Sequence, residues 1–390
     1  MKISLVVLSA AVVADGLAAG YRGQRGRRGG GGGGGGQADE AAAQLMRRIS
    51  HQYTRRVVAS LPGRTCTREN IVVRREWDSL SRHERHDYLR AVKCLIAKPS
   101  RAGNGTLARN RFEDFVMTHV DKTFSIHFSG LLLPWHRYFL WLYEQALRLE
   151  CGYQGYQPYF DWSKYVADPE SSSVFDGSDV SFSGDGEYIP HGTVHAVIAG
   201  GPPPVEYVDR LPGSGGGCVV GGPFEDLTVH IGVTNQGASS PVRIFSTPRC
   251  LSRDLNVDIL SMKNSYRNVT DLILDSPDID TFRPRVDAPT GVHGGGHGFI
   301  GGENLNQFVS LNDPVFYLHH AMLDRVWAIW QSRDVETRQY ALNGTLTWKN
   351  YPPSADATVQ DIMEVGILGS DAQIGDVMST TEGPLCYVYE

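Results

Sequence analysis

The chain has 390 residues, of which 41% are hydrophobic, enough to bury one large core or two modest ones. Its formal net charge of −6 at pH 7 excludes a general attraction to nucleic acid or to an anionic membrane, and no basic partner is required.

The N-terminal residues have the features of a processed leader. Residues 1–19 combine Lys2, a short apolar run and the small residues Ala18 and Ala19, which is the pattern of a secretory signal peptide. A membrane anchor is the weaker interpretation, because the run is shorter than the roughly 20 residues that a spanning helix needs. Residues 20–37 are rich in glycine and arginine and offer nothing to bury, so we expect a disordered leader there.

Two segments near the start of the expected folded domain, residues 38–390, have apolar residues at helical spacing: residues 38–60 and 70–97. Ser81, with Glu84 three residues later, has the capping-box pattern of a helix start in the second segment.

Beyond residue 154 the pattern changes. Between residues 154 and 289, glycine and proline become more frequent and helical periodicity fades, which predicts an irregular excursion with a few short strands. Helical periodicity returns at residues 311–333, and the chain closes with the extended segment CYVYE. The sequence therefore predicts a mainly α fold with long loops.

The cysteines and sequons fit an oxidising, glycosylating compartment. Asn104, Asn268 and Asn343 each precede a threonine by two positions, as in N-glycosylation sites. The even set of cysteines has no CxxC spacing, which disfavours zinc ribbons and thioredoxin-like motifs and favours up to three disulfides. Cys66 and Cys94 flank one helical segment and form one candidate pair, but the other pairings stay open among Cys66, Cys94, Cys151, Cys218, Cys250 and Cys386.

A first group of histidines lies in residues 112–149. His119, His127 and His136 fall close together, and Pro134 suits the first turn of a helix that starts just before His136. That helix is largely apolar, so its imidazole is expected to be buried. A buried imidazole near two others is an arrangement that a metal ion needs and a plain core does not.

A second group lies about 160 residues further on. His293 and His297 are four apart and would share one face of a helix, although the three glycines between them disfavour a helix by about 1 kcal/mol each. His320 follows inside an apolar helix, where an unpaired imidazole is costly to bury. Asp324 is four residues beyond it, in place to accept the second ring N–H of a ligating His320. A lone buried histidine with an aspartate is more often a core pair, but two such groups in one chain favour metal binding.

The remaining histidines are weaker candidates. His191 and His195 have the same spacing of four, but Pro190 and Gly192 argue for a loop. His319 must face about 100° away from His320 and is expected to pack or to hydrogen-bond. The other four have no pattern of metal ligands: His51, His83, His86 and His230.

The ligand set itself indicates a metal. Six imidazoles without a carboxylate suit copper or zinc, and copper(II) has the higher affinity. Two tri-histidine sites leave room between the metals for a small bridging molecule, which is dioxygen for copper or hydroxide for zinc.

Two long motifs resemble known signatures. LPWHRYFLWLYE at 133–144 and DPVFYLHHAMLD at 313–324 are similar to the two copper signatures of the tyrosinase and catechol oxidase branch of the type 3 copper proteins. The resemblance covers most of residues 66–390. It implies a four-helix bundle and two copper ions, with one held by His119, His127 and His136 and the other by His293, His297 and His320.

The same resemblance extends to the C-terminal end. Tyr387 and Tyr389 look like the tyrosine motif that closes the family's catalytic domain, so the chain resembles a short secreted form without the C-terminal shielding domain of longer latent fungal enzymes. The implied reaction is oxidation of an o-diphenol by dioxygen to an o-quinone and water.

Several positions depart from the family's pattern. Ser125 stands where many members have a cysteine joined to a histidine, so no thioether is expected. Gly294 follows His293 where many monophenol-hydroxylating members have asparagine, and residues 283–292 contain no glutamate, which argues against monophenol hydroxylation. Gln307 resembles the gate of the pocket, and Gly298 is expected to leave space beside it.

The leading hypothesis is therefore an extracellular copper polyphenol oxidase of o-diphenols, or of related o-aminophenols and methoxyphenols. Its partners are dioxygen and phenolic small molecules. The alternatives are a tyrosinase that hydroxylates monophenols, a hemocyanin-like oxygen carrier, and a zinc hydrolase built on the same ligands.

Overall fold

A computed structural model describes residues 33–61, 65–103, 105–198, 206–234 and 242–390. The expected signal peptide, most of the expected leader and the sequon at Asn104 lie outside these residues. The first helix, α1 (Gly33–Ala59), begins at Gly33. Residues 33–37, the end of the expected leader, are assigned to this helix.

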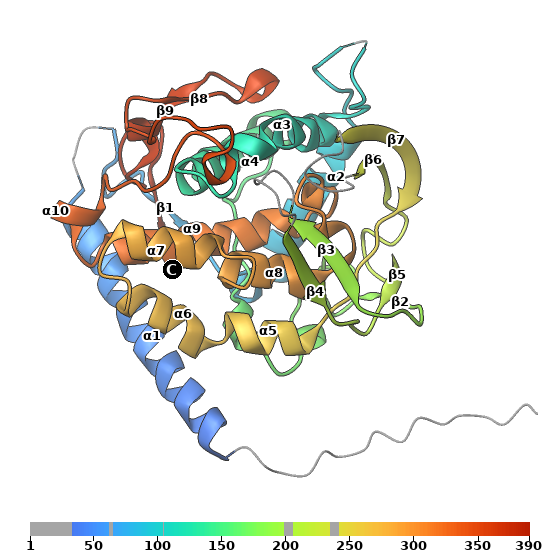
Figure 1. Cartoon of the computed structure of the whole chain (residues 1–390), viewed down its shortest axis with the longest axis horizontal. Helices are drawn as coiled ribbons and strands as arrows, with labels where there is room; N and C mark the ends of the chain where they lie inside the picture. The colour runs from blue at the N-terminus through green and yellow to red at the C-terminus, as the bar shows by residue number, and fades with distance from the viewer. Residues whose placement is uncertain (1–32, 62–64, 104, 199–205, 235–241) are drawn as a thin grey trace, which may run out of the picture.

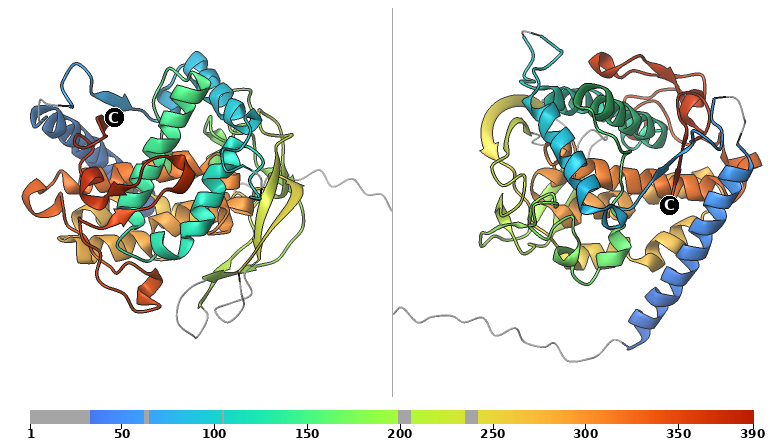
Figure 2. Two further views of the ribbon diagram at one scale, coloured as in Figure 1. Left: turned by 90° about the horizontal axis from the view of Figure 1, so that it is seen from above. Right: turned by 180° about the vertical axis from the view of Figure 1, so that it is seen from behind.

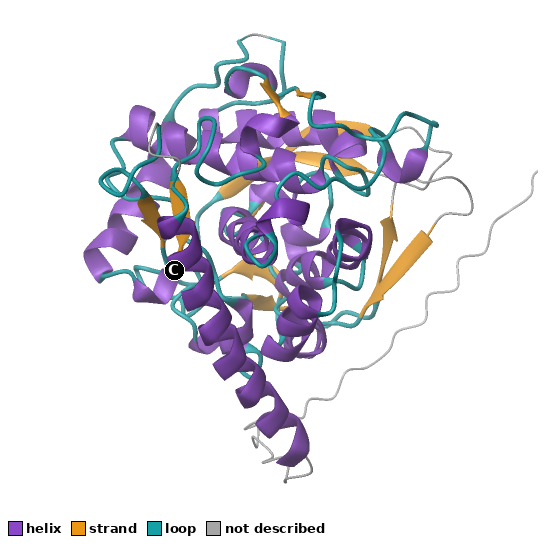
Figure 3. Ribbon diagram, turned by 90° about the vertical axis from the view of Figure 1, so that its left-hand side faces the viewer, coloured by secondary structure: helices purple, strands orange, loops and turns teal. Residues whose placement is uncertain are grey.

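The fold is mainly helical, as predicted (Figure 3). After α1 the helices are α2 (Arg82–Ala97), α3 (Arg111–Ile126), α4 (Leu132–Cys151), α5 (Val257–Asn264), α6 (Tyr266–Leu274), α7 (Ile279–Asp287), α8 (Val292–Ile300), α9 (Phe316–Gln331) and α10 (Val335–Arg338).

The strands are short and form two-stranded sheets, of which β1–β10 is parallel and β2–β5, β3–β4, β6–β7 and β8–β9 are antiparallel. Their bounds are β1 (Val72–Arg74), β2 (Gly186–Tyr188), β3 (Val194–Ile198), β4 (Glu206–Arg210), β5 (Gly216–Val219), β6 (Thr228–Thr234), β7 (Arg243–Cys250), β8 (Ile362–Met363), β9 (Ala372–Gln373) and β10 (Tyr387–Tyr389).

The helices form the body of the molecule, and the hairpins β3–β4 and β6–β7 lie along one side of it (Figures 1 and 2). The central helix is α9, in which every residue from Phe316 to Gln331 is buried. It packs against α4, where the rings of Tyr143 and Tyr317 are nearly parallel with their centres 3.4 Å apart. Large aromatic side chains such as these bury a large apolar area each and stabilise the packing of the two helices.

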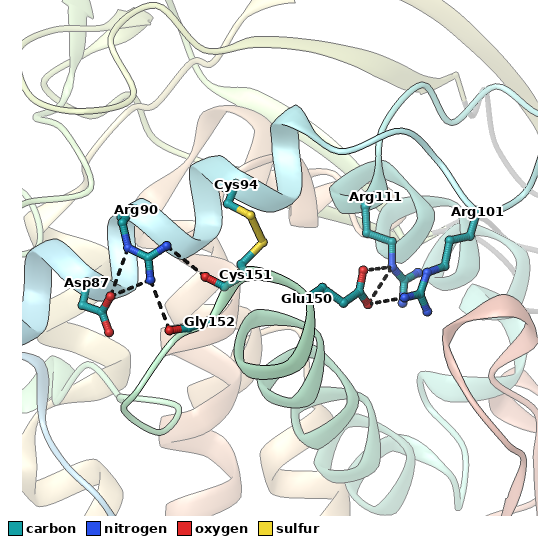
Figure 4. Close-up of a disulfide and its surroundings, with 8 residues drawn as sticks. All are labelled: Asp87, Arg90, Cys94, Arg101, Arg111, Glu150, Cys151 and Gly152. Atoms are coloured by element: carbon teal, nitrogen blue, oxygen red, sulfur yellow. Dashed lines mark hydrogen bonds and ion pairs between the residues drawn. A yellow bond between two sulfur atoms is a disulfide. The ribbon is translucent and has the colours of Figure 1, made fainter.

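A disulfide and a polar cluster join α2 to the end of α4, and a second polar cluster joins Glu150 of α4 to Arg101 and to Arg111 at the start of α3 (Figure 4). The Cys94–Cys151 bridge lies between the two helices. Beside it, Arg90 Nη1 donates to the carbonyl oxygen of Cys151 at 2.9 Å, close to the last carbonyls of α4. Gly152 caps α4 with a φ of 68°, a left-handed conformation that glycine adopts without steric cost.

The cysteines form three disulfides, as predicted, but the candidate pair Cys66–Cys94 is wrong. Cys66 pairs with Cys386, because β1 and β10 lie side by side and bring the two residues together. The remaining bridge joins Cys218 to Cys250.

The local predictions have mixed outcomes. The capping box of Ser81 and Glu84 is present at the start of α2. The helix expected over residues 70–97 is wrong in its first part, because β1 and a 3-10 turn precede α2. The excursion also contains the helices α5, α6 and α7, which were not predicted. Residues 257–287 are interrupted by polar caps such as Ser265 and Asp278, so each helix is too short to give a clear periodicity.

Candidate metal centre

The first histidine group comes from α3 and α4. His119 lies in the middle of α3, His127 ends that helix, and His136 lies in the first half of α4. One ring nitrogen from each of the three lies within 4.8 Å of the others. The structure thus brings together the three side chains predicted for the first copper.

Backbone carbonyl groups orient these three rings. The Nδ1 atoms donate to the carbonyl oxygens of Phe308 at 3.0 Å for His119, of Thr123 at 3.0 Å for His127, and of Leu132 at 2.8 Å for His136. A proton held on Nδ1 leaves the lone pair on Nε2, which is the atom that binds a metal in such an arrangement.

The second group comes from α8 and α9. His293 and His297 lie one turn apart on α8, and the Nε2 atoms of His297 and His320 are 3.2 Å apart. His297 Nδ1 lies 3.2 Å from Asn304 Oδ1, and His293 Nδ1 lies 3.7 Å from Asp287 Oδ1. The ring of His297 is therefore oriented by a side chain, whereas the three rings of the first group are oriented by the backbone.

The two groups face each other. The rings of His136 and His320 stack with their centres 4.5 Å apart and their planes 17° apart. The rings of His127 and His293 are parallel to within 2°, with centres 6.0 Å apart. Four helices, α3, α4, α8 and α9, therefore place six imidazoles around one shared interior space.

The protonation states of the rings suit a cation. Burial, together with the neighbouring imidazoles, lowers the pKa of His119, His136 and His320 well below the usual value and lowers the pKa of His127 to about 4. The rings are therefore neutral at neutral pH. The Nε2 atoms of His119, His136 and His293 are buried without a hydrogen-bond partner in the described part of the chain, and a bound metal ion would supply that partner.

His319 lies closer to the second group than the sequence predicted. A ring nitrogen of His319 also lies within 4.8 Å of those of His293, His297 and His320. Its ring is nearly parallel to that of His293, with 5.9 Å between centres. Burial lowers the pKa of His319 well below the usual value, so it too is neutral.

The glycines of α8 allow this close packing. A Cβ atom on Gly296 would lie 2.1 Å from Cε1 of His319, and one on Gly295 would lie 2.5 Å from the Asn264 side chain. A Cβ atom on Gly294 would lie 2.4 Å from the carbonyl oxygen of Pro289. The low helix propensity of these residues is therefore offset by contacts that larger residues could not make.

A pocket opens next to the histidines. His127, His293 and His297 line it together with Gly294 and Gln307, so both of these predicted pocket residues do lie there. The apolar part of its wall is formed by Phe128, Val208, Ala288, Pro289, Leu305 and Trp348. Gly298 does not leave open space as expected, because the Arg210 side chain lies where its Cβ would be, with Cζ at 2.8 Å.

The predicted role of Asp324 needs correction. Its carboxylate accepts hydrogen bonds from Arg137 Nε at 2.5 Å, Tyr387 at 2.6 Å and Tyr389 at 2.7 Å. Within the described residues it has no hydrogen bond to His320. The spacing of four correctly placed both residues on α9, but the aspartate pairs with a buried arginine of α4, which would otherwise be an uncompensated charge.

The other histidines have different partners, as expected. His191 Nε2 lies 3.0 Å from Asp254 and His195 Nδ1 lies 2.6 Å from Asp209, outside both groups. At position 125, the serine hydroxyl donates to the carbonyl oxygen of Lys122 at 2.9 Å.

Three residues of the site were missed: Asn304, Asp287 and Arg210. The sequence spacing between His297 and Asn304 does not predict their contact. The two residues meet because the chain turns back after α8. Asp287 lies six residues before His293, and its acidic side chain is the sequence signal that could have identified it. Arg210 comes from a strand of the excursion, far from either histidine group in the sequence.

The fold and the site define a helical protein with a binuclear metal centre. Residues 109–333 match the family described as "Tyrosinase: Common central domain of tyrosinase". The chain belongs to the tyrosinase family, whose members are copper-dependent oxidases. The cofactor is a pair of copper ions, and the two histidine groups fit it.

Several relatives support this assignment. The chain is 38% identical over 330 residues to Tyrosinase P of Aspergillus terreus, a match that covers 81% of this chain and 91% of the relative. It is 39% identical over 359 residues to the N-acetyl-6-hydroxytryptophan oxidase ivoB of Emericella nidulans, covering 85% and 96%. Among solved structures, a mutant polyphenol oxidase from Thermothelomyces thermophila matches with a TM-score of 0.77 and 39% identity, covering 91% of this chain and 97% of that one.

Proposed function

We propose that the protein oxidises o-diphenols, and related o-aminophenols or methoxyphenols, with dioxygen, and that diphenols leave as o-quinones. The observation that supports this proposal most directly is the pair of facing imidazole groups next to a pocket with a largely apolar wall. In this proposal His119, His127 and His136 hold one copper ion, and His293, His297 and His320 hold the other.

The reaction balances without any further cofactor. Two diphenols each lose two electrons and two protons, and one dioxygen takes up all of them to give two waters. The copper pair, when bound, supplies the site at which dioxygen accepts these electrons.

The side chains of this chain have simpler tasks. The backbone carbonyl groups behind the first group keep the Nδ1 protons in place, so that Nε2 faces the metal. The apolar wall with Trp348 and Phe128 excludes water and admits a flat aromatic ring beside His293. Gly294 also lines this pocket, and the backbone of Pro289 packs closely against it.

The diphenol preference is tested by oxygen uptake. The chain is purified and loaded with copper, its copper content is measured by mass spectrometry, and uptake is compared between 4-methylcatechol and L-tyrosine. We expect two copper ions per chain, rapid uptake with the catechol and little with tyrosine. Tyrosine hydroxylation after a lag would instead establish a tyrosinase, and reversible oxygen binding without turnover would establish a carrier.

The ligand assignment is tested by substitution. His136→Ala and His320→Ala should each lower the copper content by about one ion per chain and abolish oxygen uptake. His195→Ala is the matched control, because His195 is exposed and pairs with Asp209 away from the site. Full copper content in either of the first two variants would contradict the assignment.

We also propose that the protein is secreted. Three disulfides support this, and no helix among the described residues has the length and hydropathy needed to cross a membrane. N-terminal sequencing of protein collected from the culture medium should find cleavage after residue 19. Retention of residues 1–19 in the mature protein would contradict the proposal.

A further inference from the structure

The pocket beside the second histidine group is lined by an arginine, Arg210, which is the last residue of β4. Residues alternate between the two faces of a strand, and Val208 and Arg210 both line the pocket. Asp209, between them, is exposed and pairs with His195 on the neighbouring strand β3. The β3–β4 hairpin therefore presents one apolar and one cationic side chain to the pocket.

Arg210 is held firmly by the backbone around the site. Its Nη2 atom donates to the carbonyl oxygens of Pro289 at 3.1 Å and Gly294 at 3.2 Å. Its guanidinium group lies against Gly298, directly after His297. These contacts fix the charged group beside the segment that carries two of the proposed copper ligands.

The charge of this guanidinium group is not compensated by the described residues. Arg210 is only 9% exposed, yet it forms no ion pair with any described carboxylate, and its Nε atom is buried without a partner. No hydrogen bond from Nη1 is found in the described part of the chain either. Asp287 lines the same pocket but pairs with Arg283 instead, and burial lowers the pKa of Arg210.

Other buried arginines of this chain are compensated. Four of them pair with carboxylates, and Arg325 donates to the C-terminal residue Glu390 and to Ser50. The four pairs are Arg74 with Glu144, Arg111 with Asp114, Arg137 with Asp324, and Arg253 with Asp313. A buried charge without a counter-ion is costly, so the anion for Arg210 is expected to come from outside the chain.

We propose that Arg210 binds a carboxylate group carried by the aromatic substrate, so that the preferred substrates are phenolic acids rather than neutral phenols. This inference rests on the proposed function. A carboxylate complements a guanidinium group in charge, and Nη1 of Arg210 has no hydrogen-bond partner among the described residues. The chain as a whole has a net charge of −6, so its overall field would repel such a substrate, and the preference has to come from this local cation.

The test compares 3-(3,4-dihydroxyphenyl)propionate with its methyl ester, which carries the same ring without the charge. We expect the copper-loaded enzyme to have the higher kcat/KM for the acid. In Arg210→Gln the ratio of acid to ester should fall by about ten-fold or more, the size expected for losing a hydrogen bond to a charged group. An unchanged ratio would overturn the proposal.

Two control variants address other cations. Arg243→Gln removes an exposed arginine of β7 that does not line the pocket, and this variant should keep the wild-type ratio. Lys349 is another cation near the pocket, with Nζ 4.9 Å from the ring centre of Phe128. If Lys349→Gln lost the acid preference while Arg210→Gln kept it, the carboxylate site would not be Arg210.

A binding measurement separates this proposal from the oxidase function. In the copper-free wild-type protein, calorimetry should show tighter binding of 3-phenylpropionate than of 3-phenylpropanamide, because only the acid carries a negative charge for Arg210. Neither compound can be oxidised, and no copper competes for the acid. Equal or weaker binding of the acid would overturn the role of Arg210 even if catechols are oxidised. Tighter binding of the acid without any oxygen uptake would support Arg210 while contradicting the oxidase.

Discussion

Gly296 lies in contact with the ring of His319, so closely that a Cβ atom at position 296 would be 2.1 Å from Cε1. The two residues come from neighbouring helices, α8 and α9, and their contact sets the distance between His293, His297 and His320. The glycine run is therefore a packing requirement of the metal centre, although it looks unfavourable for a helix.

This contact predicts the effect of Gly296→Ala. Alanine is better in a helix interior by about 1 kcal/mol, but the added methyl group would push the two helices apart. We expect less than half of the wild-type copper at the second group and a lower melting temperature, measured by metal analysis and calorimetry. Gly192→Ala is the control, because a Cβ atom there meets nothing within 4 Å. A fully loaded, more stable Gly296→Ala would contradict the packing argument.

The carboxylate of Asp324 holds together α4, α9 and β10. Replacing it by asparagine leaves Arg137 buried without its counter-ion and weakens the bonds from Tyr387 and Tyr389. We expect Asp324→Asn to lower the free energy of unfolding by about 3–5 kcal/mol in urea titrations. Asp361→Asn, at a partly buried turn where the carboxylate binds Thr358, should cost about 1 kcal/mol or less. Comparable losses in the two variants would show that the network contributes little.

The disulfides should differ in their contribution to stability. Cys66–Cys386 spans 320 residues and Cys218–Cys250 spans 32. In the chain-entropy model the longer loop is worth roughly 2 kcal/mol more. The double variant Cys66→Ser/Cys386→Ser should therefore unfold at a lower urea concentration than Cys218→Ser/Cys250→Ser. The reverse order would mean that local strain or residual structure outweighs loop entropy.

The stability of the protein should also depend on pH through Glu76. Burial is the main cause that raises the pKa of Glu76 from 4.5 to about 7, although Lys164 lies 2.8 Å away and acts in the opposite direction. Because the folded state holds this proton more tightly than the unfolded state, the stabilisation is complete below pH 4.5 and is lost as the pH rises through about 7. The slope in that window is about 1.4 kcal/mol per pH unit.

Glu76→Gln cannot ionise and removes this dependence. We expect the loss of unfolding free energy between pH 5 and pH 7.5 to be smaller in Glu76→Gln than in the wild type, measured by urea denaturation at both pH values. Glu187→Gln, at an exposed position on β2, should behave like the wild type. Identical pH dependence in all three proteins would show that Glu76 titrates normally.

The sequence predicted the elements that rest on strong local signals. The capping box at Ser81 and the long apolar helix around His320 depend on residues that are close together in the chain, so their patterns can be recognised in the sequence. The grouping of the histidines was predictable because it is indicated by the spacing of His293 and His297 and by the two family motifs. The short helices of residues 257–287 lacked a comparable signal.

Contacts between distant segments were not predictable in the same way. Asp324 had one plausible neighbour by spacing, His320, and the actual partners Arg137 and Tyr387 come from elsewhere in the chain. Arg210 reaches the pocket only because the β3–β4 hairpin folds over α8. Such residues are identified by tertiary packing, which a single sequence does not specify.

The two histidine groups differ in how they tolerate change over evolution. The rings of His119, His127 and His136 donate to main-chain oxygens, which every amino acid provides, so these hydrogen bonds do not depend on the side chains of Phe308, Thr123 and Leu132. His297 instead depends on the amide of Asn304. Sequence drift in a lineage should therefore alter the second half of the centre first, and new substrate preferences are expected to originate there.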